Sequence, residues 1–252
     1  MRKLALHWKI ITGMVLGVLY GLLASKMGWV DFTNDWIKPW GKIFINLLKL
    51  IAVPLVFASL IKGVSSLSDI SKLSRIGGKT IGIYLFTTVV AVTFGLLLVN
   101  IIQPGTSFSV EKRMELKEQY ASNAASKIAS AKDVKEDGPL QFIVDMVPSN
   151  FIQATGNNKN MLQVIFFAIL FGIAMVMLPK ENTSVVKGFF DGVNDIILQI
   201  VDLIMLTAPF GVFALLVGLV VDFGGSAELF QALGVYSLSV IVGLLLMIML
   251  VY

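Results

Sequence analysis

A small group of hydroxyl side chains lies within the third of the chain's long apolar segments. Tyr84, Thr87 and Thr88 share a helical face with Ala91 and Gly95, because residues at i, i+3, i+4, i+7 and i+11 of a helix align. Sodium is a hard cation that prefers oxygen ligands, so this face could form part of a sodium site. The spacing also fits a structural role, since threonines in membrane helices often donate to the carbonyl of the preceding turn.

Charged residues also occur inside apolar segments. Asp202 lies about 9 Å inside the fifth segment, at 1.5 Å per residue. A charge at that depth costs about 2.5–3.5 kcal/mol on insertion scales and needs a partner, water or a proton, so a polar contact between helices is one role for it. Lys42 and Lys49 share a face of the second segment with Asn46 between them. These lysines could attract anions, or extend to the interface and pair.

The residues needed for catalysis are mostly missing. His7 is the only histidine, it stands at the entry to the first segment, and the chain contains no cysteine. No HExxH, GxSxG or paired intramembrane carboxylate motif is found in the sequence. We therefore predict that the protein is not an enzyme, and we expect no cofactor.

The composition is that of a membrane protein. Of the 252 residues, 56% are hydrophobic and 14% are charged, whereas about a quarter are charged in ordinary soluble domains. The net charge is +4, but no basic cluster alternates with exposed aromatic residues, so we expect the lipid bilayer as a partner and no nucleic acid. The repeated apolar runs of about 20 residues match a bilayer core of about 30 Å.

Hydropathy windows between polar breaks predict six transmembrane helices. The windows cover residues 8–25, 37–62, 79–102, 160–178, 196–221 and 228–252. Pro54 and Pro209 lie inside the second and fifth spans, where each removes one backbone donor. The fold class is therefore an all-α polytopic membrane protein.

Lysine and arginine set the predicted orientation. Basic residues precede the first span and bracket the connections between spans two and three and between spans four and five, namely Arg2, Lys3, Lys9, Lys62, Lys72, Arg75, Lys79, Lys180 and Lys187. These segments should be cytoplasmic, and so should both ends of the chain.

The polar stretch 103–139 then lies on the outer side. Its EKRMELKEQ string alternates charges at helical spacing, so we expect a partly helical, solvated loop. The segment that follows, residues 140–154, is amphipathic and fits an interfacial position.

Two further patterns concern the packing of the spans. Gly13, Gly17 and Gly21 form a doubled GxxxG pattern, which lets another backbone approach closely. The strings that begin at Pro54 and Pro209 match with one inserted residue, and each lies in the middle span of a triplet. If spans one to three and four to six are repeats, the odd number of spans makes them inverted repeats, which are frequent in transporters. The match is short and apolar, so chance is the competing explanation.

Four strings resemble the dicarboxylate/amino acid:cation symporters, the family that includes glutamate and aspartate transporters. They are LLKLIAVPLVFASLIKGVSSLSDISKLSRIGGKT, AVTFGLLLVNIIQPG, NMLQVIFFAILFGIAM and APFGVFALL, and the likeness extends from the first span to the sixth. The resemblance implies a homotrimer in the cell membrane. It also implies a static scaffold of spans one, two, four and five, and a mobile transport domain to which spans three and six belong.

The resemblance gives the chain an expected domain division and an expected ion site. We expect a first three-span repeat at residues 1–102, the polar extracytoplasmic loop at 103–139 and a second three-span repeat at 140–252. In the family, a tyrosine and two hydroxyls of the third span help to form a sodium site, and these match Tyr84, Thr87 and Thr88. The coupling ion is sodium or a proton, because relatives coupled to protons retain similar residues.

The family's substrate-binding strings do not occur in this sequence. A serine-rich re-entrant hairpin, an NMDGT-like string and a last helix with Asp, Arg and Asn would be expected to follow. We therefore expect the chain to be the N-terminal portion of a secondary transporter that imports a dicarboxylate or an acidic amino acid, with no substrate residues of its own. The alternative is a standalone membrane scaffold or oligomerisation module without transport activity.

Overall fold

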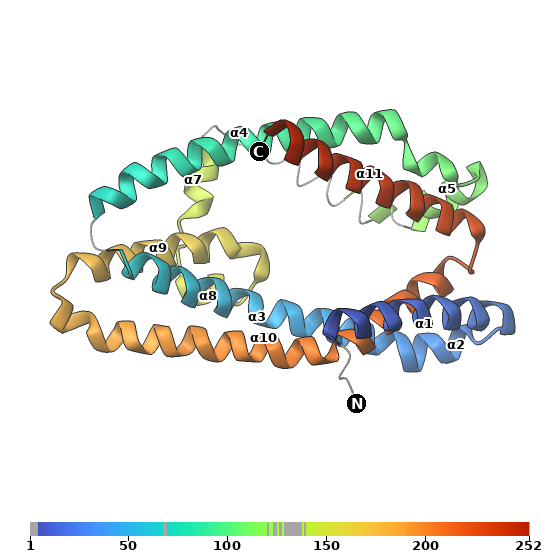
Figure 1. The fold of residues 1–252 in the computed structure, drawn as a ribbon, viewed down its shortest axis with the longest axis horizontal. Helices are drawn as coiled ribbons and strands as arrows, with labels where there is room; N and C mark the ends of the chain where they lie inside the picture. Colours follow the sequence, from blue (N-terminus) through green and yellow to red (C-terminus); the bar gives the residue numbers. More distant parts are fainter. Residues whose placement is uncertain are drawn as a thin grey trace. The chain divides into compact units, whose positions relative to one another are not determined.

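The described part of the protein consists of helices and the short connections between them. The computed structural model describes residues 5–67, 70–119, 121–122, 125, 128, 138 and 140–251, and these residues contain no strand. Six helical segments within these ranges are long and apolar enough to cross a membrane (Figure 1), namely Leu6–Met27, Val30–Ser65, Gly78–Thr106, Asn158–Met177, Lys180–Asp222 and Phe230–Met249. The predicted set of spans is therefore confirmed.

The chain divides into two compact units. Unit 1 contains Met1–Ser74 and Pro139–Gly224, and unit 2 contains Arg75–Gly138 and Gly225–Tyr252. Unit 1 is thus assembled from two separate stretches of sequence, and so is unit 2. The first, second, fourth and fifth spans belong to unit 1, and the third and sixth belong to unit 2.

Unit 1 consists of four long helices and several short ones. The long helices are α1 (Leu6–Met27), α3 (Lys38–Ser65), α9 (Met161–Met177) and α10 (Lys180–Asp222). The short helices α2 (Val30–Phe32) and η1 (Thr33–Ile37) lead into α3, and α7 (Gln141–Met146), α8 (Phe151–Thr155) and η3 (Asn158–Asn160) lead into α9. In Figure 1, α3 runs beside α10.

Helix α10 begins about four turns earlier than the hydropathy window for the fifth span. It starts at Lys180, immediately after Pro179, whereas the window starts at residue 196. The added turns are polar on one side only, because Val186 and Phe190 pack against a buried cluster that contains Ile61. Averaging over this amphipathic stretch lowers its hydropathy and hides the helix.

Helix α3 takes part in three buried clusters of unit 1. Its buried side chains Phe44, Val53 and Ile61 each belong to a different cluster. Their buried partners are Ile204 and Ala208 of α10, Ala154 of α8 with Val164 of α9, and Ala168 with Met175 of α9. The middle of α3 is therefore covered by α8 and α9, where Phe151 and Ala154 pack against it while Ile152 and Gln153 are exposed. The interfacial position expected for residues 140–154 stays a prediction.

The glycine pattern of α1 has the packing role that the sequence predicts. Gly13, Gly17 and Gly21 are buried against α10. A Cβ atom at Gly13 would lie 2.5 Å from the carbonyl oxygen of Pro209, and one at Gly17 would lie 2.8 Å from that of Phe213. Because both distances are shorter than a carbon–oxygen contact allows, only glycine permits this approach of the two backbones.

Unit 2 contains the two remaining spans and part of the polar loop. Its helices are α4 (Ile70–Ile102, from Arg75 onward), η2 (Pro104–Ser107), α5 (Val110–Gln119) and α11 (Ala227–Val251). Helix α5 covers the EKRMELKEQ string, so the expected helical part of the loop is confirmed there, while most of 120–139 lies outside the described residues. The Ser109 amide and hydroxyl donate to Oε2 of Glu228 at 3.2 and 3.3 Å, which ties the loop to the first turn of α11.

Candidate functional site

The predicted hydroxyl face lies on α4, in unit 2. Tyr84 is 70% exposed, and the Thr87 hydroxyl donates to the carbonyl of Tyr84 at 3.1 Å. This is the backbone bond that the structural interpretation predicts. It does not remove the chemical capacity of Thr87, because a hydroxyl that donates its single hydrogen keeps two lone pairs that can face a cation.

The hydroxyl face is at most a partial ion site. Among the described residues, no group of three or more His, Cys, Asp or Glu side chains could hold a metal ion. Tyr84, Thr87 and Thr88 supply neutral oxygens only, so they would need a carboxylate or carbonyl oxygens from other segments to replace the water that sodium loses. Their role in sodium binding stays a prediction.

A polar cluster joins α3 to the first half of α10. The Lys62 ammonium is 2.9 Å from Oδ1 of Asp195, and the Ser59 hydroxyl donates to Oδ1 of Asn194 at 2.8 Å. The Asn194 amide nitrogen in turn donates to Asp195 Oδ1 at 3.2 Å. Asn194 is 6% exposed, so these bonds satisfy a polar side chain that would be costly to bury alone. The cluster therefore fixes the axial position of the two helices.

A second ion pair joins the opposite ends of the same helices. The Lys38 ammonium, at the start of α3, is 2.5 and 2.7 Å from the two carboxylate oxygens of Asp222, at the end of α10. Because Lys38 meets the end of α10 while Lys62 meets its first half, α3 and α10 are antiparallel. Sequence reasoning missed both pairs. The sequence does show a charged residue without a nearby partner of opposite charge towards each end of the contact. The partners are more than 130 residues apart, so the sequence does not indicate which charges pair.

The charged residues that the sequence places inside the second and fifth spans do not take part in these two ion pairs. Asp202 is exposed on α10, and within the described ranges it forms no ion pair, so the structure does not give it the contact between helices considered for it. Lys42, Asn46 and Lys49 are all exposed on α3, which confirms that they share an open face. Neither lysine forms an ion pair with a described residue.

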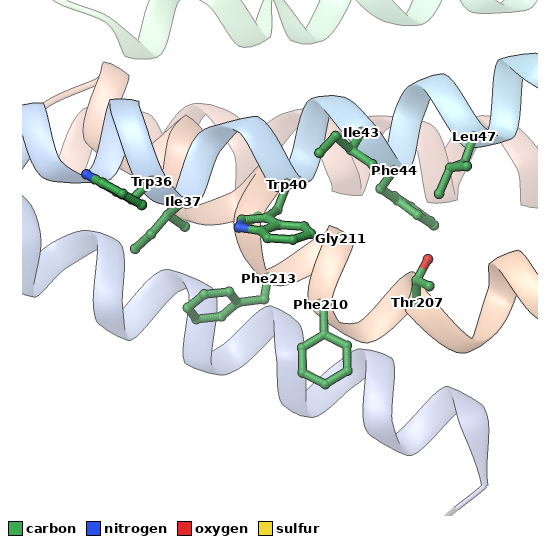
Figure 2. A pocket seen from close by; sticks show the side chains of 11 residues that line it. Trp36, Ile37, Trp40, Ile43, Phe44, Leu47, Thr207, Phe210, Gly211 and Phe213 are labelled. Carbon is green, nitrogen blue, oxygen red and sulfur yellow. The ribbon is translucent and has the colours of Figure 1, made fainter.

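An apolar groove of unit 1 lies between η1 and α3 on one side and α10 on the other (Figure 2). It has a volume of about 530 Å³, and its walls include Trp36, Trp40, Phe210 and Phe213. Its one hydroxyl, on Thr207, donates to the carbonyl of Ile204 at 2.7 Å. The groove therefore suits hydrocarbon, and no cationic side chain lines it.

A smaller groove lies within unit 2, between α4 and α11. It has a volume of about 250 Å³ and is mostly apolar, with Gly95 on one helix and Tyr236 and Ser239 on the other. The Ser239 hydroxyl donates to the carbonyl of Val235 at 2.7 Å. Gly95 belongs to the hydroxyl face, but Tyr84, Thr87 and Thr88 do not line this groove.

Comparison with known proteins assigns these helices to a family. The model of the sodium:dicarboxylate symporter family matches residues 6–252. The chain belongs to this family. The resemblance found in the sequence is thereby confirmed, and with six apolar helices the chain is a multi-pass membrane protein.

The symporter relatives carry acidic substrates. A proton/sodium-glutamate symport protein of Geobacillus stearothermophilus is 34% identical over 89% of this chain and 51% of its own length. The proton/glutamate-aspartate symporter of Escherichia coli is 33% identical, also over 89% of this chain and 51% of its own length. The C4-dicarboxylate transport protein of Bacillus subtilis is 32% identical over 86% of this chain and 48% of its own length.

The chain thus spans about half the length of the curated relatives that it matches. The family to which the chain belongs is one of symporters, which are transporters and not enzymes. Neither of the two apolar grooves described above is lined by a cationic side chain.

Proposed function

We propose that the protein takes part in secondary active transport, as a symporter that couples the import of a C4-dicarboxylate or an acidic amino acid to sodium or protons. The observation that carries this proposal is the match of residues 6–252 to the sodium:dicarboxylate symporter family. Relatives named for glutamate, aspartate or C4-dicarboxylate symport support the class of substrate.

Within the transporter, residues 1–252 would supply the N-terminal portion, with the substrate residues outside this chain. Spans one, two, four and five would form a static scaffold, and spans three and six would begin a mobile domain. The division into units supports this proposal, because unit 1 holds the first set of spans and unit 2 holds the second.

The ion site and the repeats extend the same proposal. Tyr84, Thr87 and Thr88 would provide neutral oxygens for sodium on α4. Inverted repeats at 1–102 and 140–252, on either side of the loop at 103–139, draw support from the strings around Pro54 and Pro209 and from the antiparallel contact of α3 with α10. A homotrimer in the cell membrane, with both ends of this segment in the cytoplasm, completes the proposed assembly.

Uptake measurements test the proposed function. The complete gene product, reconstituted in liposomes, should accumulate labelled succinate or aspartate when an inward sodium or proton gradient is imposed. Residues 1–252 alone, reconstituted in the same way, should not. Dissipating both gradients with ionophores is the control. Accumulation by residues 1–252 alone, or no gradient-driven uptake by the complete product of any dicarboxylate or acidic amino acid, would contradict the proposal.

A further inference from the structure

A polar groove lies beside the middle of α3, in unit 1. It has a volume of about 680 Å³. One wall is the α3 face with Asn46, Lys49, Leu50, Val53 and Pro54, and the other is the connection from α8 to η3 with Thr155, Gly156, Asn157 and Asn158. The Asn158 amide nitrogen donates to the carbonyl of Lys49 at 3.1 Å and anchors this connection to α3.

Lys49, on one wall of the groove, lies near the middle of the second membrane-spanning segment. Lys49 is about 16 Å from Lys38 and about 20 Å from Lys62 along α3, at 1.5 Å per residue. Those two lysines form the ion pairs at the ends of the α3/α10 contact. Lys49 is exposed, and within the described part of the chain its ammonium forms no ion pair. A free charge near the middle of a span is strongly disfavoured in lipid, so this face needs water or another protein surface.

The backbone that lines the groove also requires water or another protein surface beside it. The connection at Gly156 and Asn157 is not helical, and Asn157 is extended, with φ −138° and ψ 117°. Irregular backbone at membrane depth is tolerated where protein buries it or where it lines a water-filled cavity. Pro54 adds to this need, because it has no N–H and leaves the carbonyl of Leu50, on the same wall, without its helical donor.

The chemistry of the walls favours anions. Lys49 supplies a positive charge, and the residues that line the groove include no carboxylate. Asn157 uses its amide oxygen to accept from the backbone N–H of Lys159 at 3.0 Å, which leaves its amide hydrogens to donate elsewhere. One lysine, the amide groups of Asn46 and Asn157, and a surrounding medium of low dielectric would raise the local concentration of negative solutes.

We propose that this groove is filled with water and that Lys49 makes it concentrate small anions. The proposal concerns a site on unit 1 and is separate from the hydroxyl face of α4. Its test also does not depend on transport, so it stands or fails independently of the proposed symport.

The absence of cysteine in the chain provides the test, because any introduced cysteine is the only thiol. Single variants Asn46→Cys, Asn157→Cys and Ile43→Cys are placed in lipid nanodiscs, where both membrane faces meet water. They are then treated with methanethiosulfonates that carry either a sulfonate or a quaternary ammonium group. Ile43 is the matched control, because it is on the same helix but lines the apolar groove. We expect Asn46→Cys and Asn157→Cys to react at least about 100-fold faster than Ile43→Cys, since thiosulfonates require an ionised thiol in water.

The two reagents then separate water from anion attraction. After normalisation to a free thiol, the sulfonate reagent should modify Asn46→Cys about fivefold faster than the ammonium reagent, because a single charge at short range changes local ion concentration by about this factor. Adding Lys49→Met should remove the difference, and Lys49→Arg should preserve it. Folding of each variant is verified by its elution as a single species.

Each result decides one part of the proposal. Modification of Asn46→Cys and Asn157→Cys as slow as that of Ile43→Cys would mean that lipid or a second copy of the chain covers the groove, and would overturn the proposal. Equal normalised rates for the two reagents, or a preference that survives Lys49→Met, would overturn the role of Lys49.

Discussion

Gly211 shows how closely single residues determine the contact between α3 and α10. A Cβ atom at Gly211 would lie within the van der Waals radius of the Phe44 ring. Phe44 is 7% exposed and forms a cluster with Ile204 and Ala208, so a shift of its ring would break these contacts. The packing of this helix pair therefore depends on the missing side chain at position 211.

We predict that Gly211→Ala lowers the stability of unit 1 by about 1–3 kcal/mol, the usual cost of overpacking a core. The measurement is the thermal unfolding midpoint of the purified chain in detergent. Gly192→Ala is the matched control on the same helix, because a Cβ atom there would meet nothing within 4 Å and alanine favours a helix. Equal midpoints for the two variants would contradict the prediction.

The hydroxyl face gives a second prediction at this scale. Thr87→Val combined with Thr88→Val should weaken the sodium dependence of uptake by the complete transporter, because both substitutions keep the shape and remove an oxygen. The half-saturating sodium concentration for labelled aspartate or succinate is the measurement. Thr93→Val is the control, since Thr93 is on the same helix and its hydroxyl also donates to a backbone carbonyl, that of Val89 at 2.8 Å, but it does not belong to the hydroxyl face. Sodium activation that is unchanged in the double variant would exclude this face as an ion site.

At the scale of elements, α3 and α10 form an antiparallel pair held by charges towards both ends. The Lys38–Asp222 pair is partly exposed, with side-chain exposures of 31% and 38%. Solvent reduces the strength of such a pair, so its free energy is expected near the usual 0.2–1 kcal/mol, at about the upper end of that range because Asp222 binds with both oxygens.

We predict that Lys38→Met lowers the thermal midpoint of the chain and that the exchange Lys38→Asp with Asp222→Lys restores part of the loss. A double-mutant cycle with Lys38→Met and Asp222→Asn measures the coupling between the two charges. The coupling should decrease at high salt, because the pair is partly exposed. A coupling energy of zero at low salt would contradict a stabilising role for the pair.

The elements also show what the sequence could and could not predict. The six spans and the glycine contact of α1 were predictable, because hydropathy and GxxxG spacing are local signals. The first turns of α10 were not, since their apolar side matters only against Ile61 of another helix. The hydroxyls of α4 were found from helical period, but their ligand partners, like the partners of Lys38 and Lys62, depend on distant parts of the sequence.

At the scale of the whole molecule, the apolar groove and the polar groove of unit 1 require different surroundings. The groove at Trp36 and Trp40 is compatible with hydrocarbon, whereas the groove at Lys49 is not. The proposed homotrimer would separate such surfaces, with some facing lipid and others facing water or a neighbouring copy.

We predict that the complete protein, released gently from lipid nanodiscs, has a mass three times that of one chain by native mass spectrometry. We expect the scaffold spans to make the contacts between the three copies. Residues 1–252 should therefore also form a trimer, although they should not transport. A monomeric mass for both forms would contradict the proposed assembly, and a trimer of the complete protein only would place the contacts outside this chain.

The glycine contact between α1 and α10 has a consequence for how the protein is made. Gly13 is synthesised about 200 residues before Pro209, its partner, which at about 5–20 residues per second is a delay of about 10–40 s. During that interval α1 resides in the bilayer with its glycine face uncovered, and α10 must find it after α3 and α9 have already been inserted. Correct assembly therefore depends on α1 remaining beside the nascent chain until the fifth span arrives, and a slower ribosome would lengthen the period in which this face can pair wrongly.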